Sequence, residues 1–227
     1  LIRNNRNEMR RLAYYDPLTG LYNKARFVEE AMSLLKQKSD YALVLLDVVN
    51  FKFVNELFGY EKGDVLLRHV AQVCMDAIDS TELCCRDNSD KFALLMSYGE
   101  KQALTDRLTK VMESISRCQL DPVQEYRILC NCGVKTVENY NGRVDFDVFW
   151  DRADLALKNA KGNQNDAIIF YGEELHEREV KRNEIERIMH TALSNREYRM
   201  YLQPKVDLKS GRVCGAEALV RWVRPRG

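Results

Sequence analysis

Between residues 15 and 171, apolar positions follow two different spacings, one typical of strands and one typical of helices. The run YALVLLDVV at 41–49 is apolar except for Asp47, which predicts a strand buried on both faces. An alternating pattern at 126–137 and a short apolar run at 167–171 predict two more strands. Apolar residues three or four positions apart predict helices after Asn23 and at 51–58, 64–77, 100–118 and 145–161.

Residues 82–97 (ELCCRDNSDKFALLMS) predict a β-hairpin, because two apolar arms flank a polar centre rich in Asn, Ser and Asp, which favour turns. The stretch at 59–63 is expected to be a loop, after which Asp64 caps the next helix. The resulting order is strand, helix, helix, hairpin, helix, strand, helix and strand. This order predicts an α/β (α+β) fold with a mixed sheet flanked by helices.

We expect four parts in the chain, at 1–14, 15–171, 172–197 and 198–227. Residues 172–197 are strongly charged and predict an exposed linker helix, and two strand-like segments around a turn at 208–211 predict a hairpin that starts a second domain. Residues 1–14 predict the end of an incoming signalling helix, with a plain chain-end segment as the alternative. Because the chain begins without Met and stops in RPRG, we expect it to be part of a longer protein.

Composition excludes several classes of partner. The 35 Lys and Arg against 34 Asp and Glu leave no basic field for nucleic acid or a membrane surface. No apolar run approaches the ~18 residues that span a bilayer. The seven cysteines form no C-x-x-C pair, which argues against zinc and for buried thiols in a reducing cytosol. We therefore expect a cytoplasmic domain, whose full-length parent can carry a membrane anchor upstream.

Two carboxylates stand where chemistry is possible. Asp47 lies near the end of a buried strand, so it should be solvated, paired or bound to a cation, because an unpaired buried charge is costly. Asp90 and Lys91 lie side by side at the hairpin tip. Taken alone, this pair is more safely interpreted as a solvated turn than as a functional site, because such residues are common in turns.

Four segments resemble, in order and spacing, the motifs of GGDEF domains, the diguanylate cyclases that condense two GTP molecules into cyclic di-GMP. They cover 15–171 and comprise DPLTGLYNKARF at 16–27, DVVNFKFVNE at 47–56, GYEKGD at 59–64 and ADLALKNAK at 153–161. The resemblance implies the palm-like mixed sheet of nucleotide cyclases.

The resemblance also implies roles for individual residues. Asp47 and Asp90 would hold Mg²⁺ at the strand end, since hard cations take carboxylate oxygens. Asn55 and Asp64 would bind the guanine edge, and Lys52 and Lys161 would contact the phosphates. Each also has a simpler explanation: a solvated helix residue for Asn55, a helix cap for Asp64 and surface solubility for the two lysines.

The hairpin tip departs from the family signature G-G-[D/E]-E-F. The five aligned positions are Asn88, Ser89, Asp90, Lys91 and Phe92, so both glycines are lost and a lysine replaces the second acid. Val49 and Asn165 likewise replace an expected Asp and a phosphate-binding Arg. Because phosphoryl transfer depends on placed metals and cations, we expect no catalytic residues in this site. Asp79 and Glu82 replace the family's inhibitory R-x-x-D motif, so no inhibitory cyclic di-GMP site is expected there.

A second resemblance lies near the C-terminus. The segments YLQPKV at 201–206 and EALVRW at 217–222 resemble the opening of EAL domains, the cyclic di-GMP phosphodiesterases. The resemblance implies that Glu217 is a metal ligand and that Gln203 and Arg221 contact cyclic di-GMP in an intact EAL domain. The other metal ligands and the general base of that family are not in this chain.

These observations favour a catalytically inactive GGDEF domain with a regulatory role in cyclic di-GMP signalling. GTP, with Mg²⁺, or dimerisation would tune the protein's own EAL domain in response to an upstream sensor domain. One alternative is a divergent but active diguanylate cyclase. Another is a protein-interaction or homodimerisation module that binds no nucleotide. No nucleic-acid partner is expected.

Overall fold

The computed structural model describes residues 13–37, 40–122, 124, 126–137, 145–162 and 167–223. The predictions for residues 1–12 and for Asn165 lie outside these ranges. The chain divides into two compact units after Gly172. Each unit is described by itself below.

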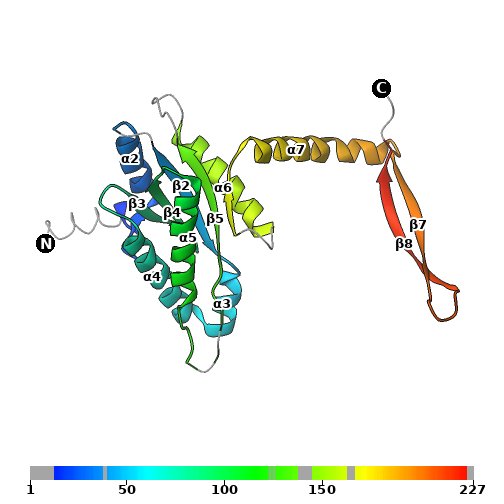
Figure 1. Ribbon diagram of the computed structural model, residues 1–227, viewed down its shortest axis with the longest axis horizontal. Helices are drawn as coiled ribbons and strands as arrows, with labels where there is room; N and C mark the ends of the chain where they lie inside the picture. Colours follow the sequence, from blue (N-terminus) through cyan, green and yellow to red (C-terminus); the bar gives the residue numbers. More distant parts are fainter. Residues whose placement is uncertain are drawn as a thin grey trace. The chain divides into compact units, whose positions relative to one another are not determined.

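The described part of the first unit contains a six-stranded sheet with the order β1-β3-β4-β2-β5-β6 (Figure 1). Strand β1 runs parallel to β3 and β5 runs parallel to β6, while the other neighbours are antiparallel, so the sheet is mixed as predicted. The strands are β1 (Tyr22–Asn23), β2 (Tyr41–Val48), β3 (Leu83–Asn88), β4 (Lys91–Ser97), β5 (Cys130–Val137) and β6 (Ile168–Phe170).

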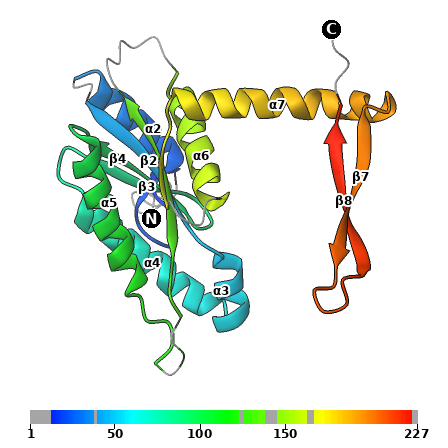
Figure 2. The same ribbon diagram turned by 45° about the vertical axis from the view of Figure 1, so that its right-hand side comes forward.

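Helices cover both faces of this sheet, as Figures 1 and 2 show. One core cluster joins the sheet to α3, α4 and α5, and the other joins the opposite face to α2 and α6. The predicted fold class is therefore confirmed. The helices are α2 (Lys24–Leu35), α3 (Phe51–Phe58), α4 (Tyr60–Ala77), α5 (Lys101–Ser116) and α6 (Phe146–Gly162).

Strand β2 is the centre of the unit, and all of its residues are buried. Ala42, Val44 and Leu46 pack on the α4 and α5 side, whereas Leu43 and Leu45 pack on the α2 and α6 side. Such alternation on two covered faces explains the nearly continuous apolar run. By the same alternation, Asp47 belongs to the face that α6 covers.

Gly133 in β5 sets the distance between the sheet and α6. A Cβ at this position would lie 2.2 Å from the carbonyl oxygen of Ala153 and 2.2 Å from the backbone nitrogen of Leu157. Backbone atoms cannot move aside as a flexible side chain can, so only glycine allows this approach. The placement of every side chain on the inner face of α6 depends on it.

The predicted loop at 59–63 is wrong, and so is the predicted helix cap at Asp64. Helix α4 begins at Tyr60, and Gly59 alone separates it from α3. Gly59 has a φ of 85°, a conformation that glycine adopts without strain, and this lets one residue end α3 and begin α4. Asp64 lies inside α4.

Strand β5 is also shorter than the predicted strand at 126–137. It starts at Cys130, which is the register partner of Val48, the last residue of β2. Before Cys130, the Leu129 carbonyl still accepts a hydrogen bond of 2.8 Å from the backbone nitrogen of Val49, but β2 has already ended at Val48. The predicted hairpin, by contrast, is confirmed as β3 and β4 with Ser89 and Asp90 between them.

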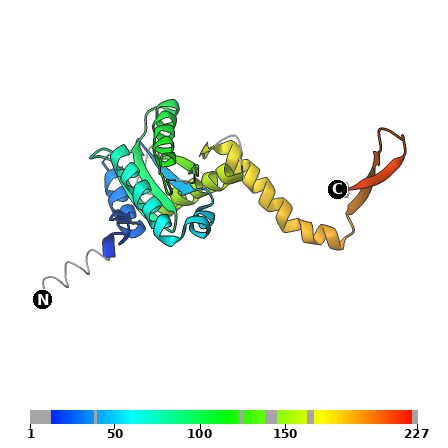
Figure 3. The same cartoon turned by 90° about the horizontal axis from the view of Figure 1, so that it is seen from below.

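The second unit consists of α7 (Glu173–Ser194) followed by an antiparallel pair, β7 (Tyr198–Val206) and β8 (Val213–Trp222) (Figure 3). The turn is held by Asp207, whose Oδ1 accepts hydrogen bonds of 2.6 Å from the backbone nitrogen and the hydroxyl of Ser210. Most side chains of both strands are exposed. The predicted helix and hairpin are therefore present, while the domain assignment stays a prediction.

Six of the seven cysteines are buried and Cys214 is exposed. Burial raises the pKa of Cys84 and of Cys130 to about 12, so these thiols stay protonated and unreactive at neutral pH. Among the described helices, none combines the length and the apolar character that crossing a membrane requires.

Candidate functional site

Four charged side chains meet on the α6 side of the sheet, at the end of β2: Asp47, Lys91, Asp154 and Lys161. Lys91 is the register partner of Asp47 across the β2–β4 ladder. Lys91 Nζ donates to Asp154 Oδ1 at 2.8 Å, and Lys161 Nζ lies 2.7 Å from Asp47 Oδ2. Asp154 and Lys161 are seven residues apart, about two turns along one face of α6. We call these four residues the charge quartet.

Burial shapes the electrostatics of the quartet. Burial raises the pKa of Asp47, which is 4% exposed; Lys161 opposes this rise and the nearby charge of Asp90 adds to it. For Asp154, burial acts to raise the pKa, but the hydrogen bonds from Lys158 and Lys91 lower it. Burial disfavours the charge of Lys91 as well, yet its ion pair with Asp154 raises the lysine pKa. The ionised pair Lys91–Asp154 is therefore the stable form.

The hairpin tip keeps the conformation that a glycine would favour. Ser89, which replaces the second glycine of the signature, has a φ of 43° in the left-handed region. Arg86 holds this turn by donating from Nε and Nη2 to the Ser89 carbonyl at 2.8 and 2.6 Å. The same guanidinium donates from Nη1 to Asp16 Oδ1 at 3.1 Å, which ties the tip to the turn before β1. The tip is thus fixed without the signature glycines.

The quartet does not fit a Mg²⁺ ion. Asp47 and Asp90 are near enough for their charges to interact, but Lys161 occupies an oxygen of Asp47 and Lys91 stands opposite it. Mg²⁺ requires an octahedron of oxygen ligands, and two ammonium groups repel a cation at this position. Among the described residues, no cluster of three or more His, Cys, Asp or Glu could hold a metal.

Asn55 is the unusual residue of the α3–α4 junction. Its Oδ1 is the one buried side-chain nitrogen or oxygen, among the described residues, that has no hydrogen-bond partner. A Cβ on Gly63 would lie 1.9 Å from this oxygen, so the glycine makes the space that the amide occupies. Asp64 follows directly on α4 and is half-buried. An orphaned buried acceptor is costly unless a ligand donates to it.

Lys52 is not brought into the quartet. Its side chain is 92% exposed, and its Nζ lies 3.7 Å from Glu56 on the same helix. Of the two lysines predicted to contact phosphate, only Lys161 lies at the end of β2.

A cavity of about 800 Å³ lies beside the quartet, and pattern reasoning did not predict it. Of the predicted site residues, only Lys161 lines it. Its wall also includes Val49 after β2, Asn131 in β5 and Thr109 and Met112 in α5. The cavity therefore does not connect Asn55 or Asp64 to the quartet.

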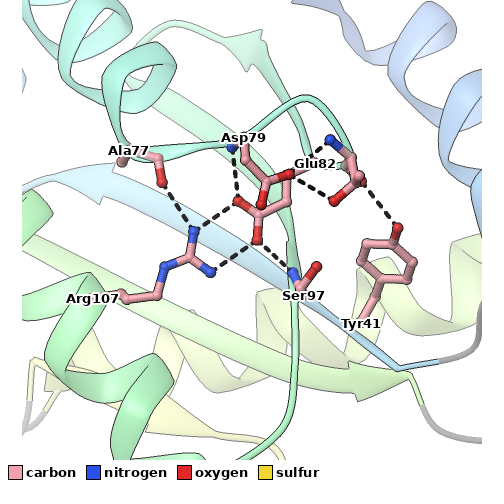
Figure 4. A network of polar contacts seen from close by, with 7 residues as sticks. Tyr41, Ala77, Asp79, Glu82, Ser97 and Arg107 are labelled. Carbon is pink, nitrogen blue, oxygen red and sulfur yellow. Dashed lines mark hydrogen bonds and ion pairs between the residues drawn. The ribbon is translucent and has the colours of Figure 1, made fainter.

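Glu82, at the place of the missing inhibitory motif, has a structural role (Figure 4). Its buried carboxylate accepts hydrogen bonds from Arg107 Nη1 and Nη2 at 2.9 and 2.7 Å, and from the backbone nitrogens of Ser97 and Asp79 at 2.7 and 3.2 Å. Burial acts to raise the pKa of Glu82, but these hydrogen bonds lower it. The network joins the segment before β3 to β4 and α5, so this carboxylate is already fully used within the fold.

The three residues with EAL-like roles share one face of the second unit's hairpin. Gln203 and Glu217 are register partners, and Arg221 lies four residues beyond Glu217 on the same strand face. The Glu217 side chain is 56% exposed and lies 3.8 Å from Lys205 Nζ.

Asp154 and Lys158 lie in the segment ADLALKNAK at 153–161, but motif reasoning gave neither of them a role. Lys158 Nζ lies 2.8 Å from Asp154 Oδ2, so Asp154 has two lysine partners. One signal in the sequence points to Asp154: it stands two helical turns before Lys161, on the helix face that carries Lys161.

The chain matches one family model and several known proteins. The family model described as "Diguanylate cyclase, GGDEF domain" matches residues 13–167. The bifunctional diguanylate cyclase/cyclic di-GMP phosphodiesterase MucR of Pseudomonas aeruginosa is 26% identical over an alignment of 230 positions that covers 100% of this chain and 33% of MucR. The protein sll1895 of Synechocystis is 30% identical over 223 residues, covering 94% of this chain and 31% of that protein. The chain thus spans about a third of the length of these relatives.

Two solved structures extend the comparison. Diguanylate cyclase SiaD of Pseudomonas aeruginosa, in complex with its activator SiaC, has a TM-score of 0.62 and 26% identity, over 74% of this chain and 66% of SiaD. The S helix-GGDEF-EAL part of Vibrio cholerae LapD, bound to c-di-GMP, has a TM-score of 0.66 and 17% identity, over 98% of this chain and 52% of that one. At 17% identity the second likeness concerns the fold alone.

Proposed function

Since this chain belongs to the GGDEF domain family of cyclic di-GMP signalling, we propose that residues 15–171 bind GTP without condensing it. The bound or empty state of this domain would regulate an EAL phosphodiesterase domain that begins near residue 198. Catalysis would be lost and nucleotide binding kept, each because of different residues.

The ion pair between Lys91 and Asp154 carries the proposal that catalysis is lost. The family signature has an acid where this chain has Lys91, and here the lysine is held at 2.8 Å by a carboxylate of α6. Proton removal from an attacking hydroxyl needs a base, and an ammonium whose pKa is raised cannot act as one. Asp47 is also paired, with Lys161. At this edge, therefore, position 91 offers no base and the carboxylate of Asp47 is not free.

The orphaned Oδ1 of Asn55 supports nucleotide binding. A guanine edge presents N1–H and N2–H donors, which an amide oxygen and a carboxylate can accept together. Asn55 and Asp64 lie on either side of the α3–α4 junction, and Gly63 between them keeps the amide in place. Adenine lacks that pair of donors, so the site should prefer GTP to ATP.

The second unit supports the regulatory part of the proposal. Gln203, Glu217 and Arg221 share one face of the β7–β8 hairpin, as substrate and metal contacts of a single EAL site would. The name of MucR assigns both diguanylate cyclase and phosphodiesterase activity to that protein. Its similarity to this chain covers the whole of this chain and a third of MucR. Partners would then be GTP, the protein's own EAL domain, an upstream sensor domain and a second copy of the chain.

Calorimetric titration with GTP and with ATP tests the proposal. We expect heat of binding for GTP, and a loss of affinity of about tenfold or more for ATP and for the Asn55→Ala variant. Asn195→Ala, an exposed position after α7, is the matched control and should bind as the wild type does. Absence of heat with millimolar GTP contradicts nucleotide binding.

Helix α7 favours a second candidate function, self-association. Ile185, Met189 and Leu193 are four residues apart on one helix face, and their exposed fractions are 44%, 40% and 64%. Such residues can pair two copies of a helix. Light scattering of the whole chain and of the triple variant Ile185→Ser, Met189→Ser, Leu193→Ser tests this candidate, and an unchanged mass contradicts it.

A further inference from the structure

Resting on the proposed GTP binding, we infer that this site takes the nucleoside triphosphate without a divalent cation. Lys91 and Lys161 would supply the positive groups that contact the phosphates. The inference concerns the charge quartet and its two flanking residues, Asp90 and Lys158.

Lysines and aspartates are present in nearly equal number at this edge of the sheet. The quartet and its flanking residues contain three lysines, Lys91, Lys158 and Lys161, against three aspartates, Asp47, Asp90 and Asp154. The charge of Asp87 also reaches Lys91, so the edge carries one net negative charge, and with a glutamate at position 91 it would carry three. The change from acid to lysine thus makes the edge less negative by two charges, which is the charge of one divalent cation.

A divalent cation would be unfavourable at Asp47. A divalent ion on Asp47 would have to displace Lys161 from a carboxylate that is only 4% exposed. Asp47 would then lose its ammonium partner, and the ion would stand near the positive charge of Lys91, the register partner of Asp47.

Lys91 and Lys161 can reach a phosphate while Asp154 and Asp47 each keep a lysine partner. Asp154 has two lysine partners, so it stays paired with Lys158 when Lys91 turns toward a ligand. Lys161 is 42% exposed and can contact a phosphate while it remains beside Asp47. Neither movement leaves a buried carboxylate unpaired, which is the costly event. Lysine binds phosphate as a point charge, without strict geometry.

Nucleotide titration in two buffers tests the inference. GTP should bind the whole chain in excess EDTA and in millimolar MgCl₂ with dissociation constants within about threefold of each other. Lys91→Glu should bind in MgCl₂ but lose about tenfold or more in EDTA. Lys209→Glu, at the exposed hairpin turn, is the control and should behave as the wild type. Circular dichroism melting checks that each variant folds, and Lys91→Met provides a second variant that removes the charge alone.

Direct metal titration gives a readout that does not depend on the nucleotide. With Mn²⁺ followed by electron paramagnetic resonance, the wild type should show no stoichiometric site, whereas Lys91→Glu should gain one that Asp47→Asn then removes. Stoichiometric Mn²⁺ on the wild type, lost in Asp47→Asn, overturns the inference. GTP binding that requires MgCl₂ overturns it too, but leaves the proposed function standing. No GTP binding in either buffer contradicts both.

Discussion

Asp47 and Lys91 face each other across the β2–β4 ladder, and each is paired with a different residue on one face of α6. Lys91 binds Asp154 and Asp47 binds Lys161, so helix and sheet share two ion pairs two helical turns apart. The arrangement satisfies a buried carboxylate with protein groups alone. Under the proposed function, this arrangement is what would let the edge bind a nucleotide without the free acids that condensation needs.

Replacing Lys91 with glutamate should destabilise the chain. The new carboxylate would oppose both Asp47 and Asp154, so three carboxylates would share two lysine partners, Lys158 and Lys161. We expect a loss of about 1–3 kcal/mol in the free energy of unfolding, measured by urea titration at neutral pH. Lys91→Met, which keeps the length of the side chain and leaves Lys158 on Asp154, should lose clearly less. Equal losses for the two variants would contradict the role given to charge.

Glu82 should govern part of the stability in acid. Its pKa in the folded chain lies below the ordinary value of 4.5, so the unfolded chain binds the proton more readily. The stabilisation is therefore complete above about pH 5 and is lost as pH falls through the lowered folded value. Glu82→Gln should flatten the pH dependence of stability in this acid range, and should cost about 2–3 kcal/mol at neutral pH because Arg107 loses its charged partner. Urea titrations from neutral pH down to about pH 3 provide the measurement.

Asp47 should change the pH dependence of stability in the opposite direction to Glu82. Burial raises its folded pKa above the ordinary 3.8, so the folded chain holds this proton more tightly than the unfolded chain does. Its contribution is favourable at low pH and is lost as pH rises through the folded value. The wild type should therefore lose some free energy of unfolding as pH rises through this range, and Asp47→Asn should not. The same urea titrations measure the difference. A steeper loss in the variant than in the wild type would contradict this sign.

Gly63→Ala should separate nucleotide binding from stability. Alanine in a helix interior usually stabilises by about 0.5–1 kcal/mol over glycine. Here its Cβ would lie 1.9 Å from Asn55 Oδ1, so the amide must move from its place. We expect GTP affinity to fall about tenfold or more while the melting temperature changes little. Gly99→Ala is the matched control, since a Cβ there has no atom within 4 Å, and its GTP affinity should be that of the wild type.

Gly133→Ala should instead disrupt the fold. A Cβ in β5 meets backbone atoms of α6 at 2.2 Å, so the helix must shift from the sheet and carry Asp154 and Lys161 with it. Overpacking of this kind costs about 1–3 kcal/mol or more. Thermal unfolding measures the loss, and a melting temperature equal to that of the wild type would show that α6 can move freely.

Sequence patterns predicted the elements of this fold better than the ion pairs between them. The run around Leu43 and Leu45 and the hairpin around Ser89 are local signals, because strand periodicity and turn chemistry act between neighbouring residues. The start of α4 was missed because Gly59 needs only one residue to turn the chain, where motif spacing suggested a loop. The partners of Lys91 and Asp47 were missed because they come from α6, and only the packing of that helix on Gly133 brings them close.

The most direct measurement of the central claim is calorimetry with GTP followed by chromatography of the same sample. Concentrated protein is titrated with GTP, incubated in Mn²⁺ and separated, with Lys91→Glu treated alongside. We predict saturable heat and recovery of intact GTP from the wild type. Cyclic di-GMP above the level formed by Lys91→Glu would contradict the claim that Lys91 ended catalysis, and the absence of heat would contradict the claim that the site still holds GTP.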